Sequence, residues 1–229
     1  MGLCNDGSGG KYRAEYQRAY KRCPDMKVFD PQENGGVSVA KNILLRWMLE
    51  ETDAEWLFVL EDDIIIKSPE AVTEYVRVAE ETGIHHFSFA HHGDGNIGGP
   101  ISTEGDVEYH FHSVGSWCMY SRESLEKVGL FDEHFHNAWE HVEMEMRLIK
   151  EGFMPGAGPH RYPDVVGSSV WLKEIPDSIE KSSIRPRDDW QSSITNGLKY
   201  WSSAKPETFE MLFGEGTYLE EYAKRLLAD

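Results

Sequence analysis

The feature that most constrains the fold is a continuous apolar run, Trp56 to Leu60, that ends directly in Glu61-Asp62-Asp63. Such a run is typical of a strand buried on both faces of a mostly parallel sheet. A helical pattern precedes it, with Ala40, Leu44, Trp47 and Met48 on one face, and another follows it from Ser68 to Gly83. This alternation predicts an α/β fold with a single, mostly parallel twisted sheet flanked by helices.

Charge and hydropathy narrow the class of protein. The chain has 229 residues, with 23 Lys and Arg against 40 Asp and Glu, so its formal net charge is −17. This charge repels phosphate backbones and anionic lipids, so we expect no nucleic-acid partner. The apolar runs are far shorter than the ~20 residues that cross a bilayer, and no secretory signal opens the sequence. We therefore expect no integral membrane segment and a cytoplasmic location.

The acidic run after the buried strand is a candidate metal site. In an extended segment alternate residues point the same way, so Glu61 and Asp63 would converge on one cation and Asp62 would face elsewhere. Carboxylate oxygens suit Mg²⁺ or Mn²⁺, and open α/β sheets bind ligands at the carboxyl ends of their strands. The alternative is that these acids cap a surface loop.

A second candidate is Trp139-Glu140-His141-Val142-Glu143, which opens a helix predicted from Trp139 to Glu151. Glu140 and His141 fall in the first turn, where a general base could point into a cleft. The alternative is that the acids only complement the helix dipole. Glu143 and Arg147 have the spacing of an ion pair within the helix.

Paired histidines leave a zinc-dependent enzyme open as an alternative. The pairs are His85-His86, His91-His92, His110-Phe111-His112 and His134-Phe135-His136. Their spacing matches no zinc signature, although His110 and His112 could share one face of a strand. Exposed or sugar-facing histidines are the preferred interpretation.

Six segments taken in order resemble the family 2 glycosyltransferases of the glycosyltransferase-A fold. They are Cys4-Asn5-Asp6-Gly7-Ser8, Glu33 to Ser38 with Lys41-Asn42, Leu60 to Asp63, Gly115 to Cys118, Phe131-Asp132-Glu133 and Trp139 to Glu143. The resemblance spans about Leu3 to Gly152. It implies a catalytic domain of this type over residues 1–175, and we expect a helical C-terminal extension over 176–229 packed on it.

The resemblance implies roles for individual residues. Asp6 would hold the nucleobase, Lys41 would lie near the nucleotide, and Asp63 would be the direct metal ligand. Glu61 would lie nearer the ribose or the metal's waters and is kept as a second metal ligand, with Asp62 also on the donor side. This acidic run resembles the DXD-type metal motif of such enzymes.

The family's catalytic Glu-Asp pair is Glu140-His141 in this sequence. His141 stands where the family has its usual Asp base, so either His141 or Glu140 could take the acceptor's proton. The family also carries a strand and a helix before its Asp-Gly-Ser turn, and we expect this unit to be missing here. His160 is the histidine that could supply a third metal ligand.

We therefore predict a glycosyltransferase dependent on Mn²⁺ or Mg²⁺, which moves a sugar from a nucleotide-diphosphate sugar, with UDP favoured, to a hydroxyl acceptor. Inversion is expected from the family. The acceptor would be a glycan, a glycoprotein or a small molecule, and would contact the stretches 91–101 and 109–117. The alternative is a non-catalytic binder of nucleotide sugars or glycans with the same fold. A nucleotidyltransferase is disfavoured, because no basic glycine-rich loop is present to hold a triphosphate.

Overall fold

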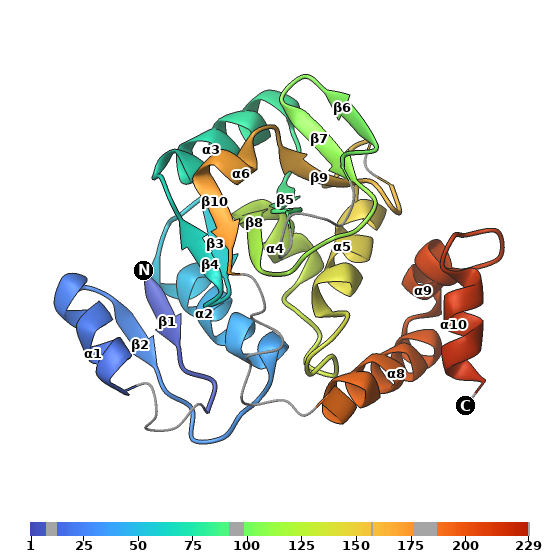
Figure 1. Ribbon diagram of the computed structural model, residues 1–229, viewed down its shortest axis with the longest axis horizontal. Helices are drawn as coiled ribbons and strands as arrows, with labels where there is room; N and C mark the ends of the chain where they lie inside the picture. The colour runs from blue at the N-terminus through green and yellow to red at the C-terminus, as the bar shows by residue number, and fades with distance from the viewer. Residues whose placement is uncertain (8–12, 92–98, 157, 176–186, 229) are drawn as a thin grey trace.

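The computed structural model describes residues 1–7, 13–91, 99–156, 158–175 and 187–228. Within these ranges the chain contains both strands and helices up to residue 174, and helices follow (Figure 1). The elements are β1 (Gly2–Cys4), α1 (Arg13–Arg22), β2 (Lys27–Phe29), α2 (Val37–Glu51), β3 (Trp56–Leu60), β4 (Ile64–Ile66), α3 (Glu70–Thr82), β5 (His86–Ser88), β6 (Ser102–Glu104), β7 (Val107–His110), β8 (Trp117–Ser121), α4 (Arg122–Val128), α5 (Glu140–Lys150), β9 (Tyr162–Val165), α6 (Ser168–Trp171), β10 (Leu172–Glu174), α8 (Arg187–Ala204), α9 (Pro206–Phe213) and α10 (Glu220–Leu227).

The centre of the molecule is the three-stranded sheet β3-β8-β5. β3 is the apolar run expected from the sequence, and its Leu57 and Val59 are buried. β8 lies between β3 and β5, runs antiparallel to both, and is buried at every residue. The α/β class is confirmed, but the expectation of a single, mostly parallel sheet is wrong for these strands. A strand covered on both faces is apolar whichever way its neighbours run, so the pattern could not fix their direction.

Three smaller sheets surround this centre. β1 and β2 pair in parallel, and α1 lies between them in the chain. Among the described strands they are the one parallel pair. β6, β7 and β9 form an antiparallel sheet, and β10 pairs antiparallel with β4 directly after the acidic run. In Figure 1 the β1-α1-β2 unit and the C-terminal helices lie at opposite ends of the long axis.

Helix α2 packs against β1 and β3 and buries a largely polar side. Its buried residues are Ser38, Lys41, Asn42 and Leu45, which is not the apolar face expected from the sequence. Asn42 donates to the carbonyl of Phe131 at 2.9 Å and accepts from its backbone amide at 3.0 Å. The buried polar side therefore binds the loop before α5, and it faces the site described below.

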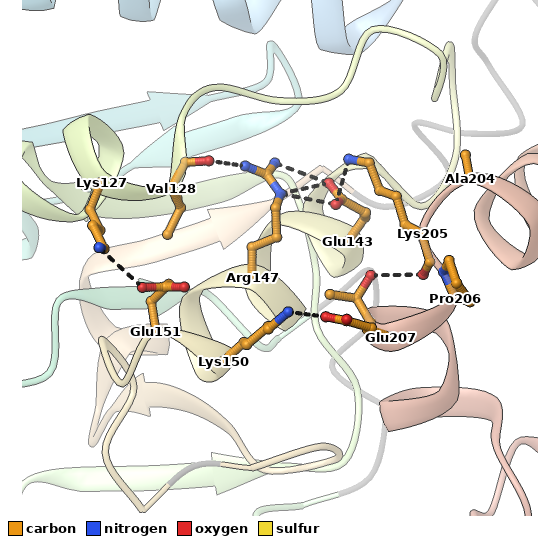
Figure 2. Close-up of a pocket in the computed structure, with 11 residues that line it drawn as sticks. Lys127, Val128, Glu143, Arg147, Lys150, Glu151, Ala204, Lys205, Pro206 and Glu207 are labelled. Carbon is orange, nitrogen blue, oxygen red and sulfur yellow. Dashed lines mark hydrogen bonds and ion pairs between the residues drawn. The ribbon is translucent and has the colours of Figure 1, made fainter.

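The helices α8, α9 and α10 pack on one another and, through α9, on α5. Figure 2 shows this junction, where Arg147 and Lys205 both point at the buried carboxylate of Glu143. Arg147 Nε lies 2.9 Å and Lys205 Nζ 2.8 Å from Glu143 Oε1, and Lys150 pairs with Glu207 nearby. The predicted Glu143–Arg147 ion pair is thus confirmed. One hydrophobic cluster continues from the sheet into these helices, as expected if the C-terminal extension packs on the rest of the chain. The division of the chain near residue 175 stays a prediction.

No helix in the described ranges combines the length and the hydropathy needed to cross a bilayer.

Candidate active site

The candidate site lies at the edge of the central sheet where β3 ends and β8 begins. These strands are paired so that Leu60 faces Trp117, and the backbone amide of Glu61 donates to the carbonyl of Ser116 at 2.9 Å. The acidic run is therefore held beside the segment Gly115-Ser116 that leads into β8. Two of the six motifs of the sequence analysis meet at this edge.

Lys41 projects from α2 to this edge and joins three parts of the site. Its Nζ lies 2.8 Å from Glu61 Oε1 and 3.4 Å from Glu140 Oε1, and it donates to the carbonyl of Gly115 at 3.0 Å. Burial disfavours a charged lysine, but Glu61 and Glu140 outweigh it, so the pKa of Lys41 is raised above its usual value. Lys41 is thus a buried, permanently charged cation between two carboxylates.

Glu140 and His141 form the first turn of α5. His141 Nδ1 lies 3.3 Å from Glu140 Oε1, and the side chains are 19% and 5% exposed respectively. Burial opposes ionisation of Glu140, yet Lys41 and then His141 hold its pKa well below the usual range. Burial alone would lower the pKa of His141, but Glu140 and Glu145 raise it above the usual value while Lys41 opposes them. The pair is therefore a carboxylate that orients a more accessible imidazole.

The residue before this pair has an unusual backbone conformation. Trp139 precedes α5 with φ 73°, a left-handed backbone conformation that residues other than glycine seldom adopt. Its indole Nε1 donates to the carbonyl of Ile194 in α8 at 3.1 Å, and its ring contacts Trp201 and Phe213 of the C-terminal helices. The C-terminal helices therefore help to fix the turn that presents Glu140 and His141.

Gly115 allows the close approach of these groups. A Cβ at this position would lie 2.9 Å from His141 Nδ1 and 3.2 Å from Lys41 Nζ. Real Cβ atoms essentially never approach within 3.0 Å of another heavy atom. The absence of a side chain here is thus a requirement of the site as it stands.

The acidic run has a different shape from the one expected. Asp62 and Asp63 lie in a turn between β3 and β4, where the amide of Ile64 donates to the carbonyl of Glu61 at 3.3 Å. The expected extended geometry is therefore wrong, and a cation shared by Glu61 and Asp63 stays a prediction. Asp62 is exposed, Asp63 is half-buried, and Glu61 is paired with Lys41. The turn still offers the hard carboxylate oxygens that suit Mg²⁺ or Mn²⁺.

Asp6 lies at the end of β1 and binds the loop before α2. Its two carboxylate oxygens accept from the amides of Gly35 at 2.8 Å and Gly36 at 3.0 Å, and the Asn34 side chain donates to its carbonyl at 2.7 Å. The structure thus brings together two further motifs of the sequence analysis. A contact of Asp6 with a nucleobase stays a prediction.

The ring contacts described for His160 are with aromatic side chains. It stacks on Phe111 with ring centroids 4.7 Å apart and lies near Tyr218. These contacts involve neither Glu61 nor Asp63, and a third metal ligand from His160 stays a prediction. Residues 92–98 of the stretch expected to contact the acceptor lie outside the described residues.

The sequence analysis missed one cluster of ligating side chains. Histidines were grouped there with their neighbours in sequence, whereas the structure brings His91 and His110 together with Glu108 and Asp164. The signal available was the alternation of Glu108 and His110, which places both on one face of a strand. Their meeting with His91 depends on tertiary structure.

Two solved glycosyltransferases have a similar structure. The mannosyltransferase PcManGT from Pyrobaculum calidifontis, in complex with GDP-Man and Mn²⁺, aligns with a TM-score of 0.61 at 14% identity, covering 99% of this chain and 62% of its own. GalNAc-T7 with UDP, GalNAc and Mn²⁺ aligns with a TM-score of 0.57 at 13% identity, covering 98% of this chain and 47% of its own. This chain has the fold of these two proteins. It spans less than two thirds of either.

No protein-family profile matches the sequence, and no curated protein does. At such low identity the two structural likenesses establish the fold of the chain and leave its reaction to be argued from the site.

Proposed function

We propose that this chain is a glycosyltransferase that moves a sugar from a nucleotide-diphosphate sugar to a hydroxyl acceptor, with Mn²⁺ or Mg²⁺ bound. The observation that carries the proposal is the convergence of Lys41, Glu61, Glu140 and His141 beside an acidic turn at one edge of the central sheet. This convergence lies in a chain with the fold of two such transferases. A cation-binding turn and a base within one site are what displacement of a diphosphate by an alcohol requires.

The proposed base is His141, with Glu140 as its positioning residue. Because Glu140 Oε1 lies 3.3 Å from His141 Nδ1, it favours the tautomer in which Nδ1 donates and Nε2 is free to accept a proton. Glu140 itself is a poor base, since Lys41 and His141 hold its pKa low. The acceptor oxygen would bond to the anomeric carbon as the bond from that carbon to the diphosphate oxygen breaks, and the proton would pass to His141 Nε2. A single displacement of this kind inverts the anomeric centre.

Lys41 would set the charge of the site. It neutralises part of the negative charge of Glu61 and Glu140, both of which would otherwise repel an anionic donor. With its ammonium donating to the Gly115 carbonyl as well, Lys41 holds α2, the segment before β8 and α5 in one arrangement. A direct contact with the nucleotide is part of the proposal.

The acidic turn would hold the metal through Asp63, with Asp62 beside it. Glu61 is the weaker candidate, because a cation bound to it would compete with Lys41 at 2.8 Å. When bound, Mn²⁺ or Mg²⁺ supplies positive charge for the diphosphate leaving group. Its oxygen donors fit the turn, and the two structural relatives were both solved with Mn²⁺.

The donor and the acceptor are proposed by class. Asp6 would hold the nucleobase, and UDP is the favoured nucleotide, with GDP the other to be tested because one structural relative binds GDP-Man and the other UDP. The acceptor would be a glycan, a glycoprotein or a small alcohol. A cytoplasmic location also stays a prediction.

The test is calorimetric titration of UDP and GDP with Mn²⁺ and then with chelator, followed by a donor panel scored for transfer and hydrolysis. We expect metal-dependent binding of one nucleotide and turnover of one of its sugars. Asp63→Asn should abolish the metal-dependent part of binding, whereas Asp53→Asn, an exposed acid before β3, should not. Nucleotide binding without turnover across the panel would instead identify a non-catalytic nucleotide-sugar binder, and no binding at all would contradict both.

The base is tested separately. His141→Asn should lower kcat by about 10²–10⁴-fold, the usual range for a general base, with donor affinity unchanged. Glu140→Gln should have a smaller effect on kcat. The reverse order would assign the base to Glu140.

A further inference from the structure

A second group of ligating side chains lies outside the site described above. His91 follows β5, Glu108 and His110 lie on β7, and Asp164 lies on β9. Each of the four offers one ligand atom, and these atoms all lie within 4.8 Å of one another. Glu108 Oε1 is central, at 3.3 Å from His91 Nε2 and 3.4 Å from His110 Nε2. Neither Glu61 nor Asp63 belongs to this group.

The buried histidine of the group has an unsatisfied nitrogen. The His110 side chain is 4% exposed, and its Nε2 makes no hydrogen bond within the described residues. Its 3.4 Å approach to Glu108 lacks hydrogen-bond geometry. A buried imidazole nitrogen without a partner is costly, and it points at the carboxylate that His91 also approaches.

The spacing of these atoms fits a tetrahedral cation. Zinc bonds nitrogen and oxygen at about 2.0–2.1 Å, so the ligand atoms of a regular tetrahedral site are about 3.3 Å apart. Two of the separations, from Glu108 Oε1 to His91 Nε2 and to His110 Nε2, are 3.3 and 3.4 Å and have this value, and the two imidazole nitrogens lie within 4.8 Å of each other. Two imidazoles and one carboxylate are also a donor set typical of zinc, whereas Mg²⁺ prefers oxygen alone.

Asp164 acts as a brace for this group. Its Oδ1 accepts from the Tyr75 hydroxyl and the Val165 amide, and its Oδ2 accepts from the Ala90 amide at 3.0 Å and the Ser168 hydroxyl at 2.8 Å. With each oxygen already accepting two hydrogen bonds, Asp164 is better placed to orient than to ligate. Through Ala90 it fixes the residue next to His91, and it lies directly opposite Glu108 in the β7–β9 pairing.

We propose that His91, Glu108 and His110 bind one zinc ion, with a fourth position open to water on the side where His91 is 30% exposed. The ion would tie the chain after β5 to the β7 strand, and so would stabilise the β6-β7-β9 sheet against the central sheet. This site is separate from the acidic turn and does not depend on the proposed transferase activity.

The test is metal analysis of full-length protein freed of any affinity tag, loaded with Zn²⁺ alone and dialysed. We expect one equivalent of zinc in the parent protein, and its loss in His91→Ala and Glu108→Gln. His91→Ala is chosen because a partly exposed position tolerates truncation, and Glu108→Gln keeps the side-chain shape. Two variants should retain the ion: His134→Ala, at an exposed histidine elsewhere, and Asp63→Asn, in the acidic turn.

Cobalt substitution gives a second measurement. Co²⁺ in a tetrahedral site absorbs visible light far more strongly than octahedral Co²⁺, so the parent protein should become coloured and Glu108→Gln should not. Zinc should also raise the thermal unfolding midpoint of the parent protein and of Asp63→Asn. Absence of retained zinc in the parent protein would refute the proposal. Equal retention by His91→Ala and Glu108→Gln, or loss in Asp63→Asn alone, would refute it as well.

Discussion

Replacing Lys41 with methionine should destabilise the protein strongly, because Glu140 would be left buried without its cation. Lys41 and Glu140 are each 5% exposed in their side chains, so neither group can turn to water. Removing one partner of a buried ion pair costs about 3–5 kcal/mol. At about 2–4 °C per kcal/mol for a chain of this size, the melting temperature should fall by about 10 °C.

The loss should depend on pH in a direction that the pKa values fix. In the parent protein the pKa of Glu140 is held low, so the group is ionised throughout the neutral range. This low pKa contributes stability that is fully present above the usual pKa of a glutamate and is lost as pH falls toward the folded value, and Lys41→Met removes the main partner that holds it low. The difference between parent and variant should therefore be full at pH 7 and smaller at pH 3.5, below the usual glutamate pKa of about 4.3.

The assay is urea unfolding followed by circular dichroism at both pH values. Arg46→Met is the matched control on the same helix, because Arg46 and its partner Glu133 are 51% and 41% exposed, and a surface pair contributes only about 0–1 kcal/mol. Adding Glu140→Gln to Lys41→Met should recover part of the loss. The reasoning is refuted if Lys41→Met resembles Arg46→Met in size and shows no dependence on pH.

Three further predictions concern the presentation of the base. The kcat/KM of the transfer reaction should rise with pH as His141 loses its proton, with a midpoint above the ~6.5 usual for imidazole. Glu140→Gln should lower that midpoint. A pH profile whose midpoint does not move in this variant would place the base elsewhere. Gly115→Ala should lower kcat by about tenfold or more with little change in melting temperature, since its Cβ would displace His141, and steady-state kinetics with a melting curve measure both. Gly197→Val should lower kcat and reduce the free energy of unfolding by about 1–3 kcal/mol in urea, because a Cβ there would lie 2.9 Å from Trp139 Cδ1. An unchanged kcat would show that the C-terminal helices do not help to position the base.

Local patterns in the sequence predicted the elements well and their arrangement less well. The apolar run Trp56–Leu60 is a strand, and the segments assigned to α2 and α5 are helices. These elements could be predicted because the spacing of apolar residues within one segment indicates its secondary structure. The direction of β8 relative to β3 is set by contacts between distant segments. Both strands are apolar, although only β8 is buried at every residue and β3 ends in an exposed Leu60, so the pattern carries no information on orientation.

The site shows the same division. The residue types were identified, but their pairing was not, because a lysine on a helix is ordinarily expected to be exposed. Only the assembled structure shows that Lys41 turns inward to Glu61 and Glu140, and that the acidic run forms a turn. The turn matters for chemistry, because Glu61 and Asp63 cannot be treated as equivalent ligands.

The charge balance of the site explains why a lysine can be buried there. Each of the charged groups comes from a different element: Lys41 from α2, Glu61 from the end of β3 and Glu140 from the start of α5. None of these ion pairs exists until the sheet edge and both helices are assembled, so burial of the ammonium is compensated only in the native arrangement. The start of α5 depends in turn on Trp139, which α8 and α9 hold. A change that loosens the C-terminal helices should therefore weaken the Lys41–Glu140 pair, and with it the orientation of the imidazole at His141.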